Sequence, residues 1–154
     1  MKKLLLPILG LVLLISISSC KKDEETTTPT PKKTNYELLV GKGWVVSSAT
    51  SSTPIDWNDD GNRSTDIYAQ MDACDKDDFT TYNVNNTYIT DEGATKCDPG
   101  DPQTWSGIWL LSSDQTTLNQ DGESAIIKGI TETTLSLEYT YVSGVTYIMT
   151  YVKK

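Results

Sequence analysis

Short segments in which polar and apolar residues alternate run through the chain, and they constrain its fold more than any other feature. The pattern is clearest at 133–142, where large side chains stand at every second position: Leu135, Leu137, Tyr139 and Tyr141. A repeat of two places alternate side chains on opposite faces of a β-strand. Pairs of turn-forming residues separate such segments at three places: Asn85-Asn86, Asp121-Gly122 and Ser143-Gly144. These residue types suit tight hairpin turns because they tolerate positive φ.

The sequence therefore predicts an all-β domain. We expect eight strands, at residues 43–50, 79–84, 87–90, 104–112, 116–119, 124–131, 133–142 and 145–152. One helical turn is expected before them at 36–40, and the many turn formers of 51–65 predict a loop. Eight antiparallel strands in chain order favour a closed up-and-down barrel, because closure removes the exposed edges that invite aggregation. A sandwich of two sheets is the alternative architecture.

The N-terminus predicts export and lipid anchoring. Residues 1–19 begin with two lysines and continue into an apolar run at 4–17, which is too short to span a bilayer comfortably. The run ends in Ile-Ser-Ser before Cys20, a pattern that resembles the bacterial lipobox, in which the cysteine becomes the lipidated first residue. Acyl chains on Cys20 would anchor the protein durably. An ordinary signal peptide with an incidental cysteine is the alternative.

A tether is predicted at residues 20–35, ahead of a single domain at 36–154. Residues 21–35 are charged or rich in Thr and Pro and contain no side chain that could pack into a core, so they favour disorder. The charged start at 20–25 resembles the export signals that carry lipoproteins of one Gram-negative lineage to the cell surface. We therefore expect the protein at the outer membrane, exposed on the cell surface.

The charge of the chain limits its partners. The formal net charge is −8, and removal of 1–19 leaves 11 basic and 21 acidic side chains, a charge of −10. Such a surface argues against nucleic acid and against electrostatic binding to anionic lipid. The chain contains no histidine, which excludes a histidine base or a histidine metal site.

Cys74 and Cys97 are the only cysteines after Cys20. In an exported chain two such thiols are expected to pair. A bridge across this span of about 24 residues would stabilise the fold by roughly 3 kcal/mol. A redox-active pair is the alternative, but the sequence has no CxxC spacing and nothing nearby that would lower a thiol pKa.

An acidic loop is a candidate calcium site. Oxygen-bearing side chains stand at alternate positions before and after Gly61: Asp56, Asn58, Asp60 and Asn62. This is the first half of a calcium-binding loop, in which Asn62 would contribute its backbone carbonyl, and Asp66 or Asp72 could supply the last carboxylate. The twelfth position, a glutamate in EF-hands, is Ile67, so the loop is not an EF-hand. A solvated turn without an ion is the alternative, because Asp, Asn and Gly favour turns themselves.

Aromatic side chains are the candidates for a ligand pocket in the barrel. They are Trp44, Trp105, Trp109, Tyr139 and Tyr141. They could line an apolar cavity, or they could fill the interior as core. Asp77 and Asp78 do not make a catalytic pair, because neighbours in a strand point to opposite faces. We expect no enzymatic activity.

Residues 36–152 resemble the lipocalin-like domain of short lipoproteins from the same Gram-negative lineage. The resemblance rests on Leu38 to Trp44, Asp66 to Gln70, Asp72 to Cys74, Lys76 to Asp78, Gly93, Lys96 to Pro99, Gly107 and Trp109. It implies an eight-stranded calycin-type barrel. The chain departs from the wider lipocalins at Lys42, where they carry glycine.

Together these patterns predict a lipid-anchored, non-enzymatic lipocalin-like envelope protein. We expect it to bind a small apolar ligand or a protein partner at the surface. The alternative is a structural or interaction lipoprotein whose barrel is filled and holds no small molecule. The two differ in whether the barrel is hollow, which the sequence does not decide.

Overall fold

The computed structural model describes residues 31–140 and 143–154. The predicted signal peptide, Cys20 and the predicted tether up to residue 30 lie outside the described residues, as does Tyr141. Residues 32–154 form one compact unit. Among the residues described, no helix is long and apolar enough to cross a membrane.

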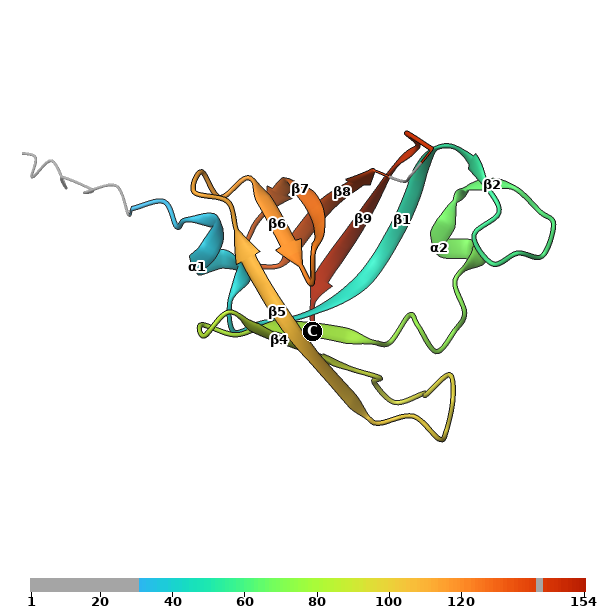
Figure 1. Cartoon of the computed structure of the whole chain (residues 1–154), viewed down its shortest axis with the longest axis horizontal. Coiled ribbons are helices and arrows are strands. Elements are labelled where there is room, and N and C mark those ends of the chain that lie inside the picture. Colours follow the sequence, from blue (N-terminus) through green and yellow to red (C-terminus); the bar gives the residue numbers. More distant parts are fainter. Residues whose placement is uncertain (1–30, 141–142) are drawn as a thin grey trace, which may run out of the picture. The chain divides into compact units, whose positions relative to one another are not determined.

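The described part of the chain contains nine strands and two short helices (Figure 1). The helices are α1 (Asn35–Leu39) and α2 (Ile67–Gln70). The strands are β1 (Gly43–Ile55), β2 (Ser64–Asp66), β3 (Phe79–Tyr82), β4 (Thr87–Asp91), β5 (Thr104–Leu111), β6 (Thr117–Gln120), β7 (Glu123–Ile130), β8 (Thr134–Thr140) and β9 (Thr146–Lys153). Each predicted strand corresponds to one of these, and β2 and α2 are additional.

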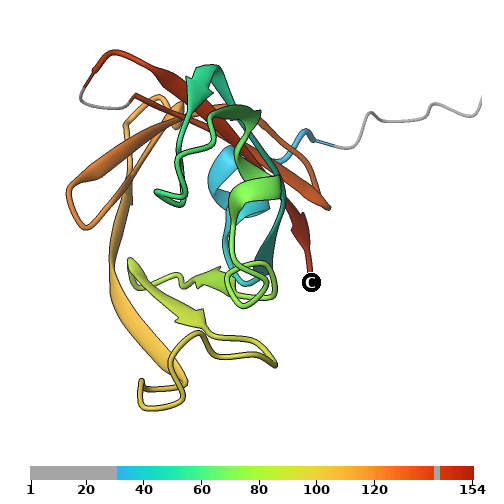
Figure 2. The same ribbon diagram turned by 90° about the vertical axis from the view of Figure 1, so that its right-hand side faces the viewer.

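Eight of the strands close into an antiparallel barrel. Strands β1 and β3 to β9 are hydrogen-bonded in chain order, and β9 pairs back with β1. The β1–β9 register runs from Trp44 opposite Lys153 to Ser51 opposite Tyr147. In Figure 2 the strands form a ring, with β1 and β9 at the top, β5 at the left and β3 and β4 below. The predicted all-β up-and-down barrel is confirmed, and the two-sheet sandwich is excluded.

Strand β1 is longer than predicted and contacts three other strands. Its first residues pair with β3 and its last residues with β2, while its other edge pairs with β9. The register of β1 shifts at Ser47, so that Val46 and Ala49 are both buried although they are three residues apart. This bulge and the run of Ser and Thr conceal the alternation of the strand. The predicted loop at 51–65 was therefore wrong for residues 51–55 and for β2.

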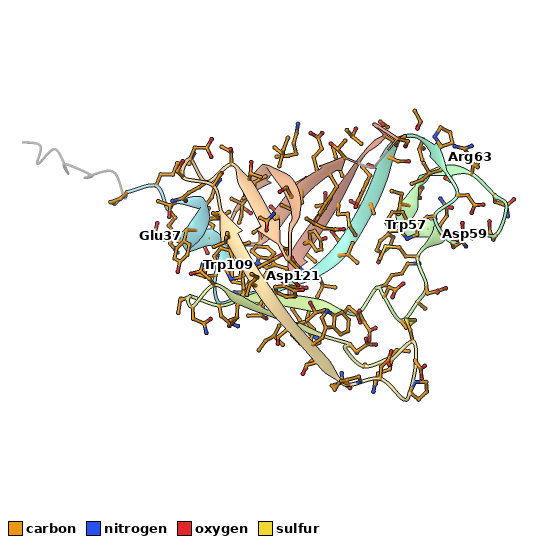
Figure 3. The ribbon with its side chains drawn as sticks, in the orientation of Figure 1. Glu37, Trp57, Asp59, Arg63, Trp109 and Asp121 are labelled. Atoms are coloured by element: carbon orange, nitrogen blue, oxygen red, sulfur yellow. A yellow bond between two sulfur atoms is a disulfide. The ribbon has the colours of Figure 1, made fainter. Side chains whose placement is uncertain are left out.

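One end of the barrel is filled. The indole Nε1 of Trp44 donates to the Leu39 carbonyl at 3.0 Å, and that of Trp109 donates to the carbonyls of Asn83 and Thr87 at 3.1 and 3.0 Å. These bonds satisfy both indoles in a core where Leu39, Trp44 and Trp109 are at most 1% exposed. Figure 3 labels Trp109 on the side of the barrel that carries α1. Helix α1, which corresponds to the helical turn predicted at 36–40, packs Tyr36 and Leu39 against this end.

Helix α1 begins one residue earlier than predicted because Thr34 caps it. The Thr34 hydroxyl accepts from the Glu37 backbone N–H at 3.2 Å, and the Glu37 carboxylate accepts from the Thr34 backbone N–H at 2.8 Å. This reciprocal capping box satisfies two N–H groups that a helix N-terminus otherwise leaves free. Thr34 and Asn35 therefore belong to the folded unit rather than to the tether.

Cys74 and Cys97 form the predicted disulfide, with their Cα atoms 5.2 Å apart. It joins the segment after α2 to the loop between β4 and β5. Asp77 organises the same loop, because its Oδ2 accepts from the backbone N–H groups of Ala94 and Thr95 at 2.7 and 3.0 Å. Gly93 has φ +67°, and a Cβ there would lie 2.5 Å from the Asp77 carbonyl oxygen, so only glycine fits.

We predict that replacing both cysteines by serine lowers the free energy of unfolding by about 3 kcal/mol, because the unfolded chain regains the freedom of a closed loop. Urea denaturation of the oxidised protein and of the double variant measures the difference. A reductant should lower the urea midpoint of the parent protein and leave that of the double variant unchanged. Equal stability of the two proteins would show that Asp77 and the strands alone hold the loop.

Candidate functional site

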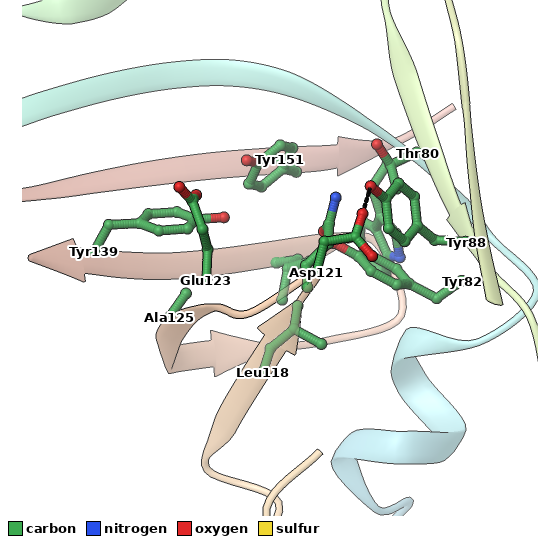
Figure 4. Close-up of a pocket in the computed structure, with 12 residues that line it drawn as sticks. Thr80, Tyr82, Tyr88, Leu118, Asp121, Glu123, Ala125, Tyr139 and Tyr151 are labelled. Atoms are coloured by element: carbon green, nitrogen blue, oxygen red, sulfur yellow. Dashed lines mark hydrogen bonds between the residues drawn. The ribbon is translucent and has the colours of Figure 1, made fainter. Parts of the chain in front are cut away.

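The barrel has a hollow away from α1. It is a partly open pocket of about 400 Å³ (Figure 4). Its lining residues come from β1, β3, β4, the β6–β7 hairpin, β8 and β9: Trp44, Thr80, Tyr82, Tyr88, Leu118, Gln120, Asp121, Glu123, Ala125, Leu135, Tyr139 and Tyr151. The volume lies within the range of small-molecule sites. The described barrel is therefore filled at one end and hollow at the other.

The β6–β7 hairpin sets one wall of the pocket through its register. Leu118 stands opposite Ala125 and Gln120 opposite Glu123. Residues directly opposite each other in an antiparallel pair share a face, and this face is the interior because Leu118 and Ala125 are 2% and 3% exposed. The small Ala125 side chain leaves space that a larger residue would occupy. Glu123 accordingly stands at an inward-facing position.

A hydrogen bond joins this hairpin to β4. The Tyr88 hydroxyl donates to Asp121 Oδ2 at 2.5 Å, and the Ile108 backbone N–H donates to Asp121 Oδ1 at 2.9 Å. These two donors lower the pKa of the Asp121 carboxyl, the tyrosine bond being the larger cause. Gly107 makes the approach possible, because a Cβ there would collide with both Asp121 oxygens. Asp121 is thus held as a charged group at the edge of the pocket.

Four tyrosines supply most of the aromatic lining. The Tyr82 hydroxyl donates to Gln120 Oε1 at 2.8 Å, next to the Tyr88–Asp121 bond. Burial raises the pKa of Tyr82, Tyr139 and Tyr151, and burial followed by the bond to Asp121 raises the pKa of Tyr88. All four phenols therefore stay protonated and uncharged at neutral pH.

The formal charge in the pocket is entirely negative. Asp121 and Glu123 line it, and none of the described lining residues is lysine or arginine. Figure 4 shows Glu123 beside Tyr139 and Asp121 directed at Tyr88. The Glu123 side chain forms no hydrogen bond or ion pair with other described residues. Burial, and to a smaller extent the negative charge of Glu123, raise the pKa of Tyr139.

An aromatic series leads from this pocket to a second hollow. Tyr139 stacks on Tyr147 with ring centroids 5.0 Å apart, and Tyr147 meets Trp57 edge-on at 5.7 Å. The second hollow has about 150 Å³ and is lined by Ile55, Asp56, Trp57, Asp59, Val145 and Tyr147. Figure 3 places Trp57 and Asp59 at the end of the barrel that carries β2 and α2.

Comparison with known proteins assigns a family. Residues 20–153 match the family described as Domain of unknown function (DUF5004). The chain belongs to the DUF5004 family. A search of curated proteins found no match to the chain. The barrel of this DUF5004 domain is compatible with a ligand-binding or a structural role.

The five predicted pocket residues of the DUF5004 domain have different positions. Trp44 and Tyr139 line the pocket, and Tyr141 lies outside the described residues. Trp109 shares an inward face with Trp105, but it is 1% exposed and packs at the filled end against Tyr36. Trp105 stands near the start of β5, is 44% exposed and does not line the pocket. Sequence periodicity gives the face of a strand but not the depth of a residue along the barrel.

Several lining residues were not predicted, above all Gln120, Asp121 and Glu123. The sequence predicts a turn at Asp121-Gly122, but it does not assign this turn or its flanking residues to a pocket. The signal was present: a two-residue Asp121-Gly122 turn pairs Gln120 with Glu123, and Leu118 on the same face is apolar. Asp121 and Gly122 both have positive φ, 50° and 95°, as such a turn requires.

The predicted calcium loop of the DUF5004 domain is a hydrogen-bonded turn. Asp56 accepts from the backbone N–H groups of Asp60 and Gly61 at 3.1 and 2.9 Å, and Asp60 Oδ1 accepts from the Asn62 N–H at 2.7 Å. Asp60 Oδ2 accepts from the Asn58 amide at 3.2 Å. Asp66 instead caps α2, since its carboxylate accepts from the Ala69 N–H at 3.0 Å.

Within the described ranges, three acidic or thiol groups come close enough to share an ion only at Cys74, Asp75 and Cys97. Two of these three are joined in the disulfide and cannot act as thiolate ligands. The carboxylates of the 56–66 loop are not gathered in this way. Calcium binding therefore stays a prediction.

This prediction has a direct test. Excess calcium should raise the melting temperature of the protein, and Asp56→Ala together with Asp60→Ala should abolish the rise because both carboxylates are lost. Thermal unfolding with and without a chelator measures both effects. A rise that persists in the double variant would place the ion elsewhere, and the absence of a rise in the parent protein would make the loop a simple turn.

A second acidic cluster lies next to the disulfide. Burial, and then the charges of Glu92 and Asp75, raise the pKa of Asp78 to about 6. Within the described residues, Asp77 Oδ1 and Asp78 Oδ1 are buried and accept no hydrogen bond. Glu92 is 7% exposed. Ionised Asp78 is therefore unfavourable in the folded protein.

We predict that Asp78→Asn stabilises the DUF5004 domain above neutral pH. The folded pKa of Asp78 lies above its unfolded value, so the stability linked to its protonation is complete below about pH 4 and is lost as pH rises through about 6. The gain in melting temperature should consequently be largest near pH 8 and shrink toward pH 4. Exposed Asp101→Asn is the control. A gain that is constant with pH would contradict the assignment.

Proposed function

We propose that this DUF5004 protein is a lipid-anchored, non-enzymatic envelope protein of the lipocalin-like type, which binds a small molecule in its barrel. The observation that carries this proposal is the pocket of about 400 Å³ between the β6–β7 hairpin and the tyrosines. A filled barrel would have left no such space. The hollow supports a binding role over a purely structural one.

The lipid anchor and the place of the protein rest on the sequence alone. The apolar run before Cys20 and the charged residues after it support lipidation at Cys20 and attachment to the outer membrane, on the cell surface. The folded unit begins close to Thr34, so about a dozen residues separate it from the anchor. A fully extended tether of this length reaches roughly 45 Å.

The sequence predicts an apolar ligand. The pocket lining also contains many polar side chains, which a ligand would have to match. Eight of its lining side chains carry a hydroxyl, amide or carboxylate group: Thr80, Tyr82, Tyr88, Gln120, Asp121, Glu123, Tyr139 and Tyr151. Apolar surface comes from Trp44, Leu118, Ala125 and Leu135. A small ligand with an apolar body and at least one polar group suits this lining better than a purely apolar one.

A binding face for a protein partner is the second candidate function. Exposed apolar side chains point outward from β5 and β7, the two strands that flank β6, with Ile108 61% exposed, Leu110 55% and Ile126 49%. Such residues on an outer barrel surface are typical of contact sites. This role does not need the pocket, so substitutions on the outer face and substitutions in the pocket would affect different functions.

The test is native mass spectrometry of the exported domain, residues 32–154. We expect an organic molecule to remain bound and to be released on activation. Ala125→Leu should abolish the adduct, because the added side chain enters the pocket, whereas Ile126→Leu on the outer face should retain it. Circular dichroism checks that both variants fold. An unliganded mass from several hosts, or an adduct that persists in Ala125→Leu, would refute ligand binding in this pocket.

A further inference from the structure

We infer that the pocket selects a small organic cation, an amine or ammonium group on an apolar or aromatic body. This inference rests on the proposed function, since it names the chemical class of the ligand in the same pocket. It is carried by an inward-facing carboxylate without a basic partner, a second charged carboxylate beside it, and an aromatic lining that contains no positive charge among the described residues.

Glu123 is the central observation. Its register opposite Gln120 places it on the inward-facing side of the hairpin, where it is exposed to solvent at the mouth of the pocket. Two other glutamates near it in the chain do have lysine partners: Glu132 lies 2.6 Å from Lys33 and 2.9 Å from Lys42, and Glu138 lies 3.4 Å from Lys128. No ion pair is formed by Glu123 in the described part of the chain. The Glu123 carboxylate is therefore free to pair with a ligand ammonium group at the mouth of the pocket.

Asp121 adds a second negative charge on the same hairpin. It is already fixed in position by the Tyr88 hydroxyl and the Ile108 N–H, so it needs no rearrangement to face a cation. The charge of −10 on the chain after residue 19 acts in the same direction over longer distances. Together these charges disfavour carboxylate ligands such as fatty acids.

The tyrosine rings provide the other half of a cation site. Trp44 and four tyrosines line the pocket, and uncharged aromatic faces attract ammonium groups. Because the phenols stay protonated, they add no further charge and leave their π-faces available. Tyr139 is held in orientation by stacking on Tyr147 and stands beside Glu123 (Figure 4). A cation near Tyr139 would meet an aromatic ring and a carboxylate at once.

Three probes of similar shape test the charge preference: phenethylamine, phenethyl alcohol and hydrocinnamate. Each is titrated into the full chain, purified after export, and binding is followed by calorimetry and by the fluorescence of tryptophan. We expect the amine to bind at least about tenfold more tightly than the alcohol, and the carboxylate to bind most weakly. Because the alcohol is uncharged, its affinity measures how well the pocket accommodates the shared shape of the probes without any effect of charge.

The variant Glu123→Gln removes the charge and keeps the shape. It should reduce the advantage of the amine over the alcohol several-fold and leave the alcohol unaffected. Glu138→Gln removes a glutamate of the neighbouring β8 strand that pairs with Lys128. It should change neither the advantage of the amine over the alcohol nor the affinity for the alcohol. These two variants alter the net charge of the protein equally.

Each outcome decides a different claim. An alcohol that binds as well as the amine, or a carboxylate that binds best, would overturn the cation inference and leave the proposed binding function intact. An amine preference that is unchanged in Glu123→Gln would also overturn the inference. Failure of all three probes to bind would count against the inference, while an organic adduct in native mass spectrometry would still support the proposed function.

Discussion

The pairing of β9 with β1 is the constraint on which the rest of the structure depends. It joins the last strand of the barrel to the first over a register that extends from Trp44 to Ser51. Without it the sheet would have two exposed edges and no enclosed interior. With this pairing the sheet closes, and all inward-facing side chains lie in one enclosed barrel interior. Strand β1 can serve this role because it is long, and because the bulge at Ser47 lets it bend between its pairing with β3 and its pairing with β2.

The interior is divided between stability and binding. At the α1 end, large side chains with satisfied indole groups fill the space, so that Leu39, Trp44 and Trp109 are almost fully buried. Beyond them the interior positions become small or polar, as at Ala125 and Glu123, and the pocket opens. The bond between Tyr88 and Asp121 holds the β6–β7 hairpin against the wall of the barrel, and Gly107 provides the space for it. The same bond therefore shapes the pocket and keeps one of its charges in place.

The sequence predicts the architecture well because alternation is strong where a strand has one buried face. Leu135 and Leu137 are each 1% exposed, as their period of two requires. Prediction from alternation fails for residues 51–55, because Ser and Thr give no apolar period there. It also fails at the Ser47 bulge, which reverses the faces of β1. The site is harder to predict, because Trp109 and Tyr139 look alike in a pattern of aromatic residues although one fills the barrel and the other lines the pocket. Asp121 and Glu123 were missed because both are exposed residues in or beside a turn, and the sequence does not show that this turn borders a pocket.

The central claim is that the barrel is hollow at one end only, and NMR with a small neutral nitroxide tests it most directly. The Ala125 and Leu39 side chains are both buried, at 3% and 0% exposed, but Ala125 lines the pocket whereas Leu39 belongs to α1 at the filled end. If the pocket admits the nitroxide, the Ala125 methyl signal should broaden much more strongly than the Leu39 methyl signals. Equal protection of the two residues would mean that the interior is filled throughout, and it would contradict the account.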